Sequence, residues 1–365
     1  MNRGGEELPR DDEAARRLAL AFGWNTTSYQ ILNPGIGHWV APELPAVVGY
    51  VRRGGYLVAA GAPACPEEKL REAAAEFERF ARGQRRRVCW VCAEERLRNA
   101  LADGDHAAIA IGAQPAWDPA GWEAMVSARA ALRAQLNRAR NKGVRIEEVG
   151  NDDAARRPEL RRCVEEWLKT RRLPPLHFLT EPQTLEGVMA DRIILAARRD
   201  GQTVAFLLAS PVGPRNGYLV EQIARTQRAP NGTSELLIDA AMRRFAREGR
   251  SYATLGLVAL AWEKTPEMGT NPWWVRATMR LARAHAWRFY NFRGLLRFRT
   301  KLAPDGWESV FAIANERRFS LQAMYAVGGA FSGISPALAL ATGVGKAARQ
   351  EWKWFQKKLR RGGRE

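Results

Sequence analysis

Two short hairpin signals, one in each half of the chain, restrict the fold more than any other feature of the sequence. In the first half, apolar runs at 46–53 and 55–63 meet at a Gly-Gly pair. In the second half, runs at 192–199 and 203–212 meet at an Asp-Gly pair. Two-residue turns of these kinds favour antiparallel strands, because their twist matches that of the flanking strands. The turn residues are Gly54, Gly55, Asp200 and Gly201.

Alternating helix and strand patterns surround both hairpins. Apolar periodicity predicts helices at 11–22, 67–82, 94–102, 122–141, 153–171, 233–248, 272–286 and 291–298. It predicts further strands at 86–92, 106–112, 144–149, 217–225, 252–258 and 307–314. We therefore predict an α/β (α+β) fold of two tandem domains with mixed, antiparallel-rich sheets.

The predicted domain boundaries follow from this repeat of elements. Residues 24–150 form the first domain, and 151–315 form the second, which is expected to be catalytic. Residues 1–23 are a helical extension, and 316–365 are a tail that is apolar and then basic. The uncharged run 319–345 is long enough to cross a bilayer, but its glycines and a proline argue against a straight spanning helix. We expect shallow membrane contact there; a helix pair packed on the protein is the alternative.

The charge balance indicates an anionic partner. The chain holds 57 Lys and Arg against 39 Asp and Glu, a net charge of +18. Such a surface attracts nucleic acid or an anionic membrane, and a basic surface that binds neither is the alternative. No apolar signal-peptide core opens the chain, so we expect a cytoplasmic protein on the inner face of the cell membrane.

Two classes of site are excluded by spacing. The only Cys-x-x-Cys pair, Cys89 and Cys92, has neither a second pair nor histidines at ligand spacing, so we expect ordinary thiols and no metal. The Gly-x-Ser-x-Gly pattern is absent and the four histidines form no nucleophile pattern, which excludes a serine hydrolase of that type.

A run of bases near the middle of the chain is the first candidate binding site. No acid lies between Glu123 and Glu147, whereas six bases do. A cationic helix face of this kind holds phosphates by charge alone; a solvated face is the alternative. The candidate residues for tRNA or phosphate are Arg129, Arg133, Arg140 and Lys142.

The segment 217–245 is the second candidate site, because it places a strand, a loop and a helix in succession. Asn231 or Thr233 is expected to cap the helix, whose free N–H groups would favour an anion. The arrangement resembles the acyl-coenzyme A N-acetyltransferases. Their Gly-rich pyrophosphate loop is missing, however, because Asn231 follows Arg228 where that family has glycine.

The same region resembles a more specific family. "RAPNGTSELLIDAAMRRFAREG" and "FYNFRGLLRFRTKLAPDGWE" are similar to the C-terminal catalytic region of bacterial phosphatidylglycerol aminoacyltransferases, and "LNRARNKGVRIEEV" is similar to the bridge between their domains. The resemblance covers about residues 24–315, without the N-terminal flippase that many members carry. It implies tandem acetyltransferase-like domains, aminoacyl-tRNA as donor, an anionic lipid such as phosphatidylglycerol as acceptor, and no cofactor.

Most site residues carry over from the resemblance position by position. The implied catalytic residues are Arg225 and Lys301, and Glu221 is our own candidate for a weak base that accepts the hydroxyl proton. The implied substrate-binding residues are Gln222, Asn231, Gly232, Glu235, Tyr290, Asn291, Arg293 and Arg299. One departure matters, because the family often has an aspartate where this chain has Gln222. Glu221 is adjacent, but neighbouring strand residues face opposite ways unless a bulge intervenes.

These residue types suit ester exchange. An aminoacyl ester is already activated, so the enzyme has only to hold two anionic substrates together and stabilise an oxyanion. Arginine forks suit both tasks. Two alternatives stay open: the same fold acting on a peptide, cell-wall precursor or small amine, and an inactive relative that binds anionic lipid or nucleic acid. The sequence does not indicate the amino acid transferred or the oligomeric state.

Overall fold

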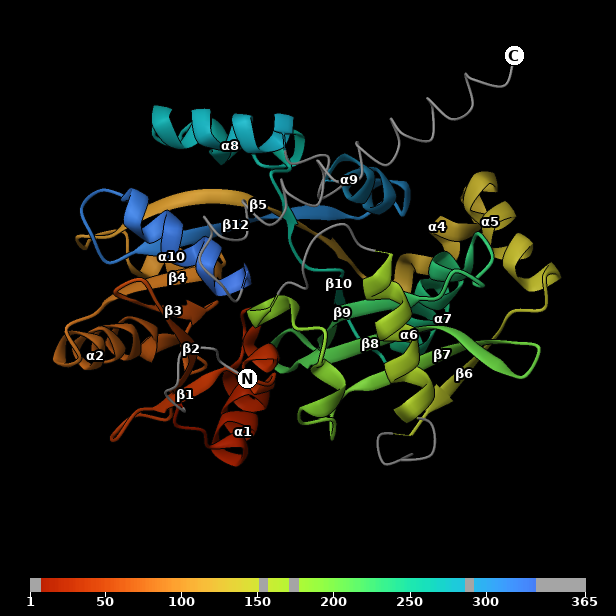
Figure 1. Ribbon diagram of the computed structural model, residues 1–365, viewed down its shortest axis with the longest axis horizontal. Coiled ribbons are helices and arrows are strands. Elements are labelled where there is room, and N and C mark those ends of the chain that lie inside the picture. The colour runs from red at the N-terminus through yellow and green to blue at the C-terminus, as the bar shows by residue number, and fades with distance from the viewer. Residues whose placement is uncertain (1–7, 151–156, 171–176, 286–291, 333–365) are drawn as a thin grey trace, which may run out of the picture.

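The computed structural model describes residues 8–150, 157–170, 177–285 and 292–332, and these form a mixed α/β structure (Figure 1). One twelve-stranded sheet runs through it in the order β1-β2-β3-β4-β12-β5-β10-β9-β8-β7-β6, with β11 (Val258–Ala259) paired to β5. The other strands are β1 (Gly37–Val40), β2 (Val47–Arg53), β3 (Tyr56–Ala60), β4 (Arg87–Ala93), β5 (Ala107–Trp117), β6 (Arg145–Val149), β7 (Ile193–Arg199), β8 (Gln202–Val212), β9 (Gly217–Arg225), β10 (Tyr252–Thr254) and β12 (Gly306–Ala314).

Both predicted hairpins are confirmed. β2 pairs antiparallel with β3, and β7 with β8. All four turn residues have positive φ, between +49° and +83°, as a type I′ turn requires. The sheet is mixed but mainly antiparallel, as predicted, because only the β3–β4 and β9–β10 pairs are parallel among the described strands.

Two strands pair with strands from the other half of the sequence. β6 precedes residue 150 yet pairs with β7. β12 comes last in the chain yet lies between β4 and β5, pairing with both. β10 then pairs with β5, which makes the sheet continuous. The boundary at residue 150 stays a prediction, and the strands on either side of it share one sheet.

Helices cover the sheet and bury separate clusters of apolar residues in the two halves. The predicted helix 122–141 divides at Arg129, whose backbone is extended (φ −116°, ψ 91°). Its two parts pack with the helix that follows β9. The helices are α1 (Asp12–Phe22), α2 (Leu70–Gly83), α3 (Glu95–Ala100), α4 (Trp122–Ala128), α5 (Ala130–Asn141), α6 (Arg157–Lys169), α7 (Thr233–Arg247), α8 (Trp273–His285), α9 (Phe292–Lys301) and α10 (Leu321–Ser332).

The described part of the apolar tail packs on the protein. α10 buries Ala323, Ala326 and Ala330 and contacts β2, β3 and β4. Up to residue 332 the tail therefore follows the alternative in which it packs on the protein. The rest of 319–345 lies outside the described residues. Among the helices of the described ranges, none is both long and apolar enough to cross a bilayer.

Candidate active site

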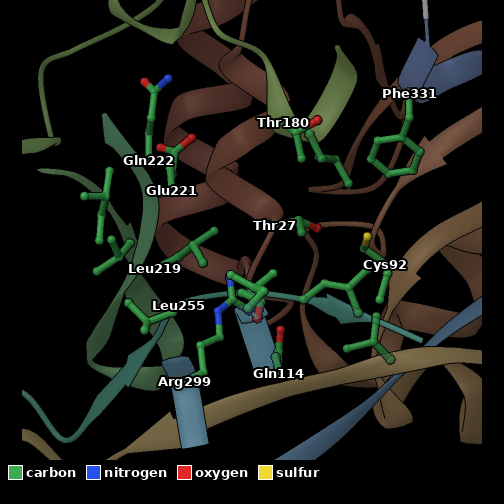
Figure 2. A pocket seen from close by; sticks show the side chains of 18 of the residues that line it. Thr27, Cys92, Gln114, Thr180, Leu219, Glu221, Gln222, Leu255, Arg299 and Phe331 are labelled. Carbon is green, nitrogen blue, oxygen red and sulfur yellow. Dashed lines mark hydrogen bonds between the residues drawn. The ribbon is translucent and has the colours of Figure 1, made fainter. Parts of the chain in front are cut away.

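A cavity of about 1070 Å³ lies where the two halves of the sheet meet. β9 and the start of α7 form one wall, and β4, β5, β12 and α10 form the other. Figure 2 shows Glu221, Gln222 and Leu219 along β9, with Thr27, Cys92, Gln114 and Phe331 across from them. The volume is large for a small-molecule pocket and leaves room for parts of two substrates.

β9 contains a bulge where it passes the cavity. Leu208 of β8 pairs with Gln222, and Ala209 pairs with Val220, which leaves Glu221 without a partner residue on β8. A bulge of this kind re-aims a side chain. Glu221 and Gln222 both line the cavity, together with Leu219, Val220 and Ile223 of the same strand.

Glu221 is held in a buried ion pair. Its side chain is 2% exposed and that of Arg192 is fully buried. The guanidinium Nε of Arg192 donates to Oε1 at 2.8 Å, and Gln30 Nε2 donates to Oε2 at 3.2 Å. Arg192 also donates to Asn33 Oδ1 at 2.6 Å. The carboxylate is thus fixed in place, with both oxygens already accepting hydrogen bonds.

Gln222 offers an unused polar atom to the same cavity. Its Oε1 is buried and has no hydrogen-bond partner among the described residues. The residue as a whole is 9% exposed. A buried amide oxygen without a partner is costly unless a ligand or water satisfies it. An amide cannot serve as a proton acceptor as an aspartate would, but it can orient a bound group.

The start of α7 faces the cavity without a side-chain cap. The expected caps are wrong, because Gly232 is the N-cap and Thr233 Oγ1 donates instead to the Pro230 carbonyl at 2.7 Å. Gly232 has φ +96°, and a Cβ there would lie 2.1 Å from the Gln135 carbonyl oxygen of α5. Only glycine meets both conditions. Asn231, Gly232 and Glu235 line the cavity.

The closing cations approach the same region from α9. Arg299 lines the cavity and donates to the Gly256 carbonyl oxygen (Figure 2). Lys301 donates from Nζ to Glu235 Oε1 at 2.6 Å, so it joins the site through that carboxylate. Arg225 lines the exposed rim, and it has no ion-pair or hydrogen-bond partner for its guanidinium among the described residues.

The predicted stripe on α5 does not line the cavity. Arg140 donates to Asp239 at 3.0 Å, and Arg133 donates to the Ser127 carbonyl at the end of α4. Arg129 and Lys142 are exposed elsewhere on the surface. The cavity side of the helix carries Arg138 and Gln135 instead. Arg293 is exposed on α9 outside the lining, and Tyr290 and Asn291 lie outside the described residues.

A polar network behind the opposite wall was missed by sequence reasoning. Gln114 of β5 lines the cavity and donates to two carboxylates, Glu94 Oε1 at 3.1 Å and Glu308 Oε2 at 2.9 Å. Arg215 bridges the same two carboxylates. The one available signal is that Gln114 is the only side chain able to hydrogen-bond between Ala107 and Pro115 of its strand.

The two carboxylates of this network differ in their electrostatics. Burial raises the pKa of Glu94, which the Arg215 charge opposes only in part. Burial also acts to raise the pKa of Glu308, but hydrogen bonds from Arg215 and Gln114 outweigh it, so that pKa is lowered. One charged pair and one carboxyl that is easier to protonate therefore join the two halves next to the cavity.

No metal centre is suggested by the described residues, in which no three His, Cys, Asp or Glu side chains gather at ligand distance. All four cysteines are buried and free.

Comparisons with known proteins show which folds and which family this chain resembles. Two solved structures share the fold: the C-terminal domain of a protein designated a lysylphosphatidylglycerol synthetase from Agrobacterium fabrum, and L-PGS from Bacillus licheniformis. The first is 20% identical over 88% of this chain and 96% of its own, with a TM-score of 0.73. The second is 19% identical over 89% and 98%, with a TM-score of 0.71.

A Bacteroides thetaiotaomicron protein of unknown function is also similar, with 12% identity over 84% of this chain and 97% of its own and a TM-score of 0.59. No curated protein sequence matches. The family model described as "Phosphatidylglycerol lysyltransferase, C-terminal" matches residues 16–314. The predicted mixed α/β fold and the family resemblance are both confirmed. The chain therefore belongs to the phosphatidylglycerol lysyltransferase C-terminal family, a family of lipid aminoacyltransferases.

Proposed function

We propose that this protein transfers an aminoacyl group from aminoacyl-tRNA to a hydroxyl of an anionic lipid such as phosphatidylglycerol, on the cytoplasmic face of the membrane. The observation that carries the proposal is the shared cavity. Arg225, Arg299 and the open start of α7 supply positive charge on one wall. Apolar side chains of β5, β12 and α10 form the other, which suits a lipid that carries its phosphate beside apolar chains.

The chemistry needs few groups. The lipid hydroxyl oxygen attacks the ester carbonyl carbon, the bond to the ribose oxygen breaks, and the hydroxyl proton ends on that ribose oxygen. One ester replaces another, so neither an energy source nor a cofactor is expected. Arg299 and the N–H groups at the start of α7 would stabilise the oxyanion, and Arg225 would hold a phosphate. Lys301 would act through Glu235, to which it is bonded.

Glu221 is the proposed proton acceptor, and its ion pair limits how it can act. Oε1 accepts from Arg192 at 2.8 Å, so proton transfer would use Oε2, which accepts two longer bonds, from Gln30 at 3.2 Å and from Arg192 at 3.5 Å. Gln222, Asn231, Tyr290, Asn291 and Arg293 are proposed to contact the substrates. Replacement of Glu221 by Gln is expected to lower kcat and to remove a limb of its pH profile. An unchanged profile would leave Glu221 a positioning role only.

The test uses purified protein, tRNA charged with a labelled amino acid, and vesicles that contain phosphatidylglycerol. Labelled lipid should form only with intact charged tRNA and should be lost in Arg225→Ala. Arg228→Ala is the matched control, because Arg228 lies three residues away, outside the cavity lining, and donates to Gln202 at 2.7 Å. Product made from acyl-coenzyme A alone would overturn the donor, and the absence of labelled lipid with lysyl-, alanyl- and arginyl-tRNA would overturn the reaction.

A second function is favoured by one observation, the amide at Gln222. Without an acid there, the chain would be an inactive relative that binds anionic lipid or nucleic acid. Vesicle binding without product, unchanged in Gln222→Ala, would support this second function. Restored product in Gln222→Asp would show that the amide is what stops the reaction.

A further inference from the structure

Helix α8 has two faces of opposite character. Val275 is fully buried and Met279 is 7% exposed, and Thr278 and Met279 line the cavity. Trp273 and Leu281 are 75% and 61% exposed. Side chains eight positions apart lie near the same face of a helix, so Trp273 and Leu281 mark one outward stripe. Exposed large apolar side chains that share one stripe indicate a surface that contacts a protein or a membrane.

The outward stripe belongs to a firmly attached helix. Asn271, just before α8, exchanges two hydrogen bonds with the Ala110 backbone of β5, at 2.9 and 2.8 Å. Trp274 packs against the first core, whereas its neighbour Trp273 points outward. The exposure of Trp273 is therefore set by how α8 is seated. The helix forms the upper margin of the molecule in Figure 1, above β5 and β12.

The charge on α8 itself is positive, and one of its arginines, Arg283, is paired with Glu263 at 3.1 Å. Neither α8 nor α9 contains an acidic residue. Arg280 is exposed on α8, with its guanidinium carbon 5.6 Å from the Trp262 ring centroid. Arg293 and Arg297 are exposed on α9. Apolar anchors flanked by arginines are the composition of a helix that lies in the headgroup region of an anionic bilayer.

We propose that the outward face of α8 docks this protein on an anionic membrane, with Trp273 and Leu281 entering the headgroup region and the arginines of α8 and α9 on lipid phosphates. This deepens the proposed function and rests on it, since the membrane is the source of the lipid. α10 also exposes apolar side chains, Leu321 at 69% and Tyr325 at 45%, but it carries no charged residue. Arg317 and Arg318 are exposed just before α10, and Arg317 pairs with Asp105 at 3.1 Å. Only α8 combines exposed apolar side chains with arginines on the helix itself, and we select it for that reason.

The position of α8 gives docking a consequence. Its inner face lines the cavity and its outer face would lie on the bilayer, so one helix separates the lipid from the reaction site. A lipid could pass around α8 without crossing open water. Transfer of its apolar chains through water would expose them to solvent, which is unfavourable.

The experiment measures vesicle binding directly. The test variant is Trp273→Ala with Leu281→Gln, and the matched control is Leu321→Gln on α10. The probes are vesicles of mixed phosphatidylglycerol and phosphatidylcholine, vesicles of phosphatidylcholine alone, and uncharged tRNA. The wild type and the control should bind anionic vesicles equally, and the test variant should bind them about tenfold or more weakly. All three should bind tRNA equally and show the same circular dichroism.

Other outcomes overturn the proposal. Unchanged vesicle binding by the test variant, a loss in the control, binding to neutral vesicles as strong as to anionic ones, or a loss of tRNA binding in the test variant would each do so. Activity separates this from the proposed function. The test variant should aminoacylate a short-chain, monomeric phosphatidylglycerol as the wild type does and lose activity on vesicles. If the wild type acts on neither lipid, the proposed function fails while the docking result stands.

Discussion

The ion pair between Arg192 and Glu221 allows a sharp test of how the candidate site is built. Both side chains are essentially buried, at 0% and 2% exposure, and the shortest contact is 2.8 Å. Arg192→Met would leave the Glu221 carboxylate in that environment with Gln30 as its remaining donor. Removal of one partner from a buried pair costs about 3–5 kcal/mol, because the other charge is left uncompensated.

The double variant should lose less free energy of unfolding than the two single variants lose together. Glu221→Leu alone leaves a buried guanidinium that still donates to Asn33 and Val188, so its cost falls in a similar range. Arg192→Met with Glu221→Leu removes both charges. It leaves two acceptors, Asn33 Oδ1 and the Val188 carbonyl oxygen, without their donor, and each loss costs about 1 kcal/mol. The free energy of unfolding should then fall by about 2–3 kcal/mol in the double variant, a coupling of about 3 kcal/mol or more between the two sites.

Urea unfolding followed by tryptophan fluorescence and circular dichroism measures these free energies, provided that the two transitions coincide. Arg317→Met is the control, because Arg317 pairs with Asp105 at 3.1 Å while both are mostly exposed, at 84% and 73%. In that control, the free energy of unfolding should fall by less than about 1 kcal/mol. A buried, coupled ion pair is refuted if Arg192→Met lowers the free energy of unfolding no more than the control does. It is also refuted if the losses in the two single variants add up to the loss in the double variant.

Three further predictions concern stability and reactivity. Gly232→Ala should lower the free energy of unfolding by about 2 kcal/mol or more, since Ala would need positive φ and its Cβ would meet the Gln135 carbonyl; an unchanged urea midpoint would contradict this. Burial lowers the pKa of His38, whose Nδ1 accepts from the Asp11 N–H and whose Nε2 donates to the Ile31 carbonyl. The unfolded chain therefore binds this proton first, so stability should fall as pH drops below about 6.5, and His38→Gln should flatten that slope. Native protein at pH 8 should show no fast thiol reaction with a disulfide reagent and four thiols after unfolding, because burial raises the pKa of every cysteine; a fast native thiol would refute this.

The local structure was largely predictable because it depends on local chemistry. The two hairpins follow from turn residues that tolerate positive φ, and the strands and helices follow from apolar periodicity. The order of strands was not predictable in the same way. β12 is inserted between β4 and β5 by contacts with residues about 200 positions earlier, and no local pattern encodes such a pairing.

The candidate site also contains residues that local motifs predict and residues that only long-range contacts place. Residues within the two family-like motifs, such as Asn231, Glu235 and Arg299, meet at the cavity, and their roles stay predictions. On α5, Arg138 lines the cavity and the predicted Arg133 and Arg140 do not, because tertiary packing decides which face of a helix meets the cavity. Gln114 was missed because its partners, Glu94 and Glu308, come from strands and loops far apart in the sequence.

The surroundings of Glu221 and Gln222 determine the charge on the β9 side of the cavity. Glu221 lies in the cavity wall beside Gln222, so an acid is present there. That acid is neutralised by Arg192, however, and the amide beside it carries no charge. The uncompensated charge on this side of the cavity is therefore positive, from Arg225 and the uncapped start of α7. A site with that balance stabilises a developing oxyanion better than it removes a proton. Exchange of one ester for another needs the first more than the second, so Arg225→Ala should cost more activity than Glu221→Gln.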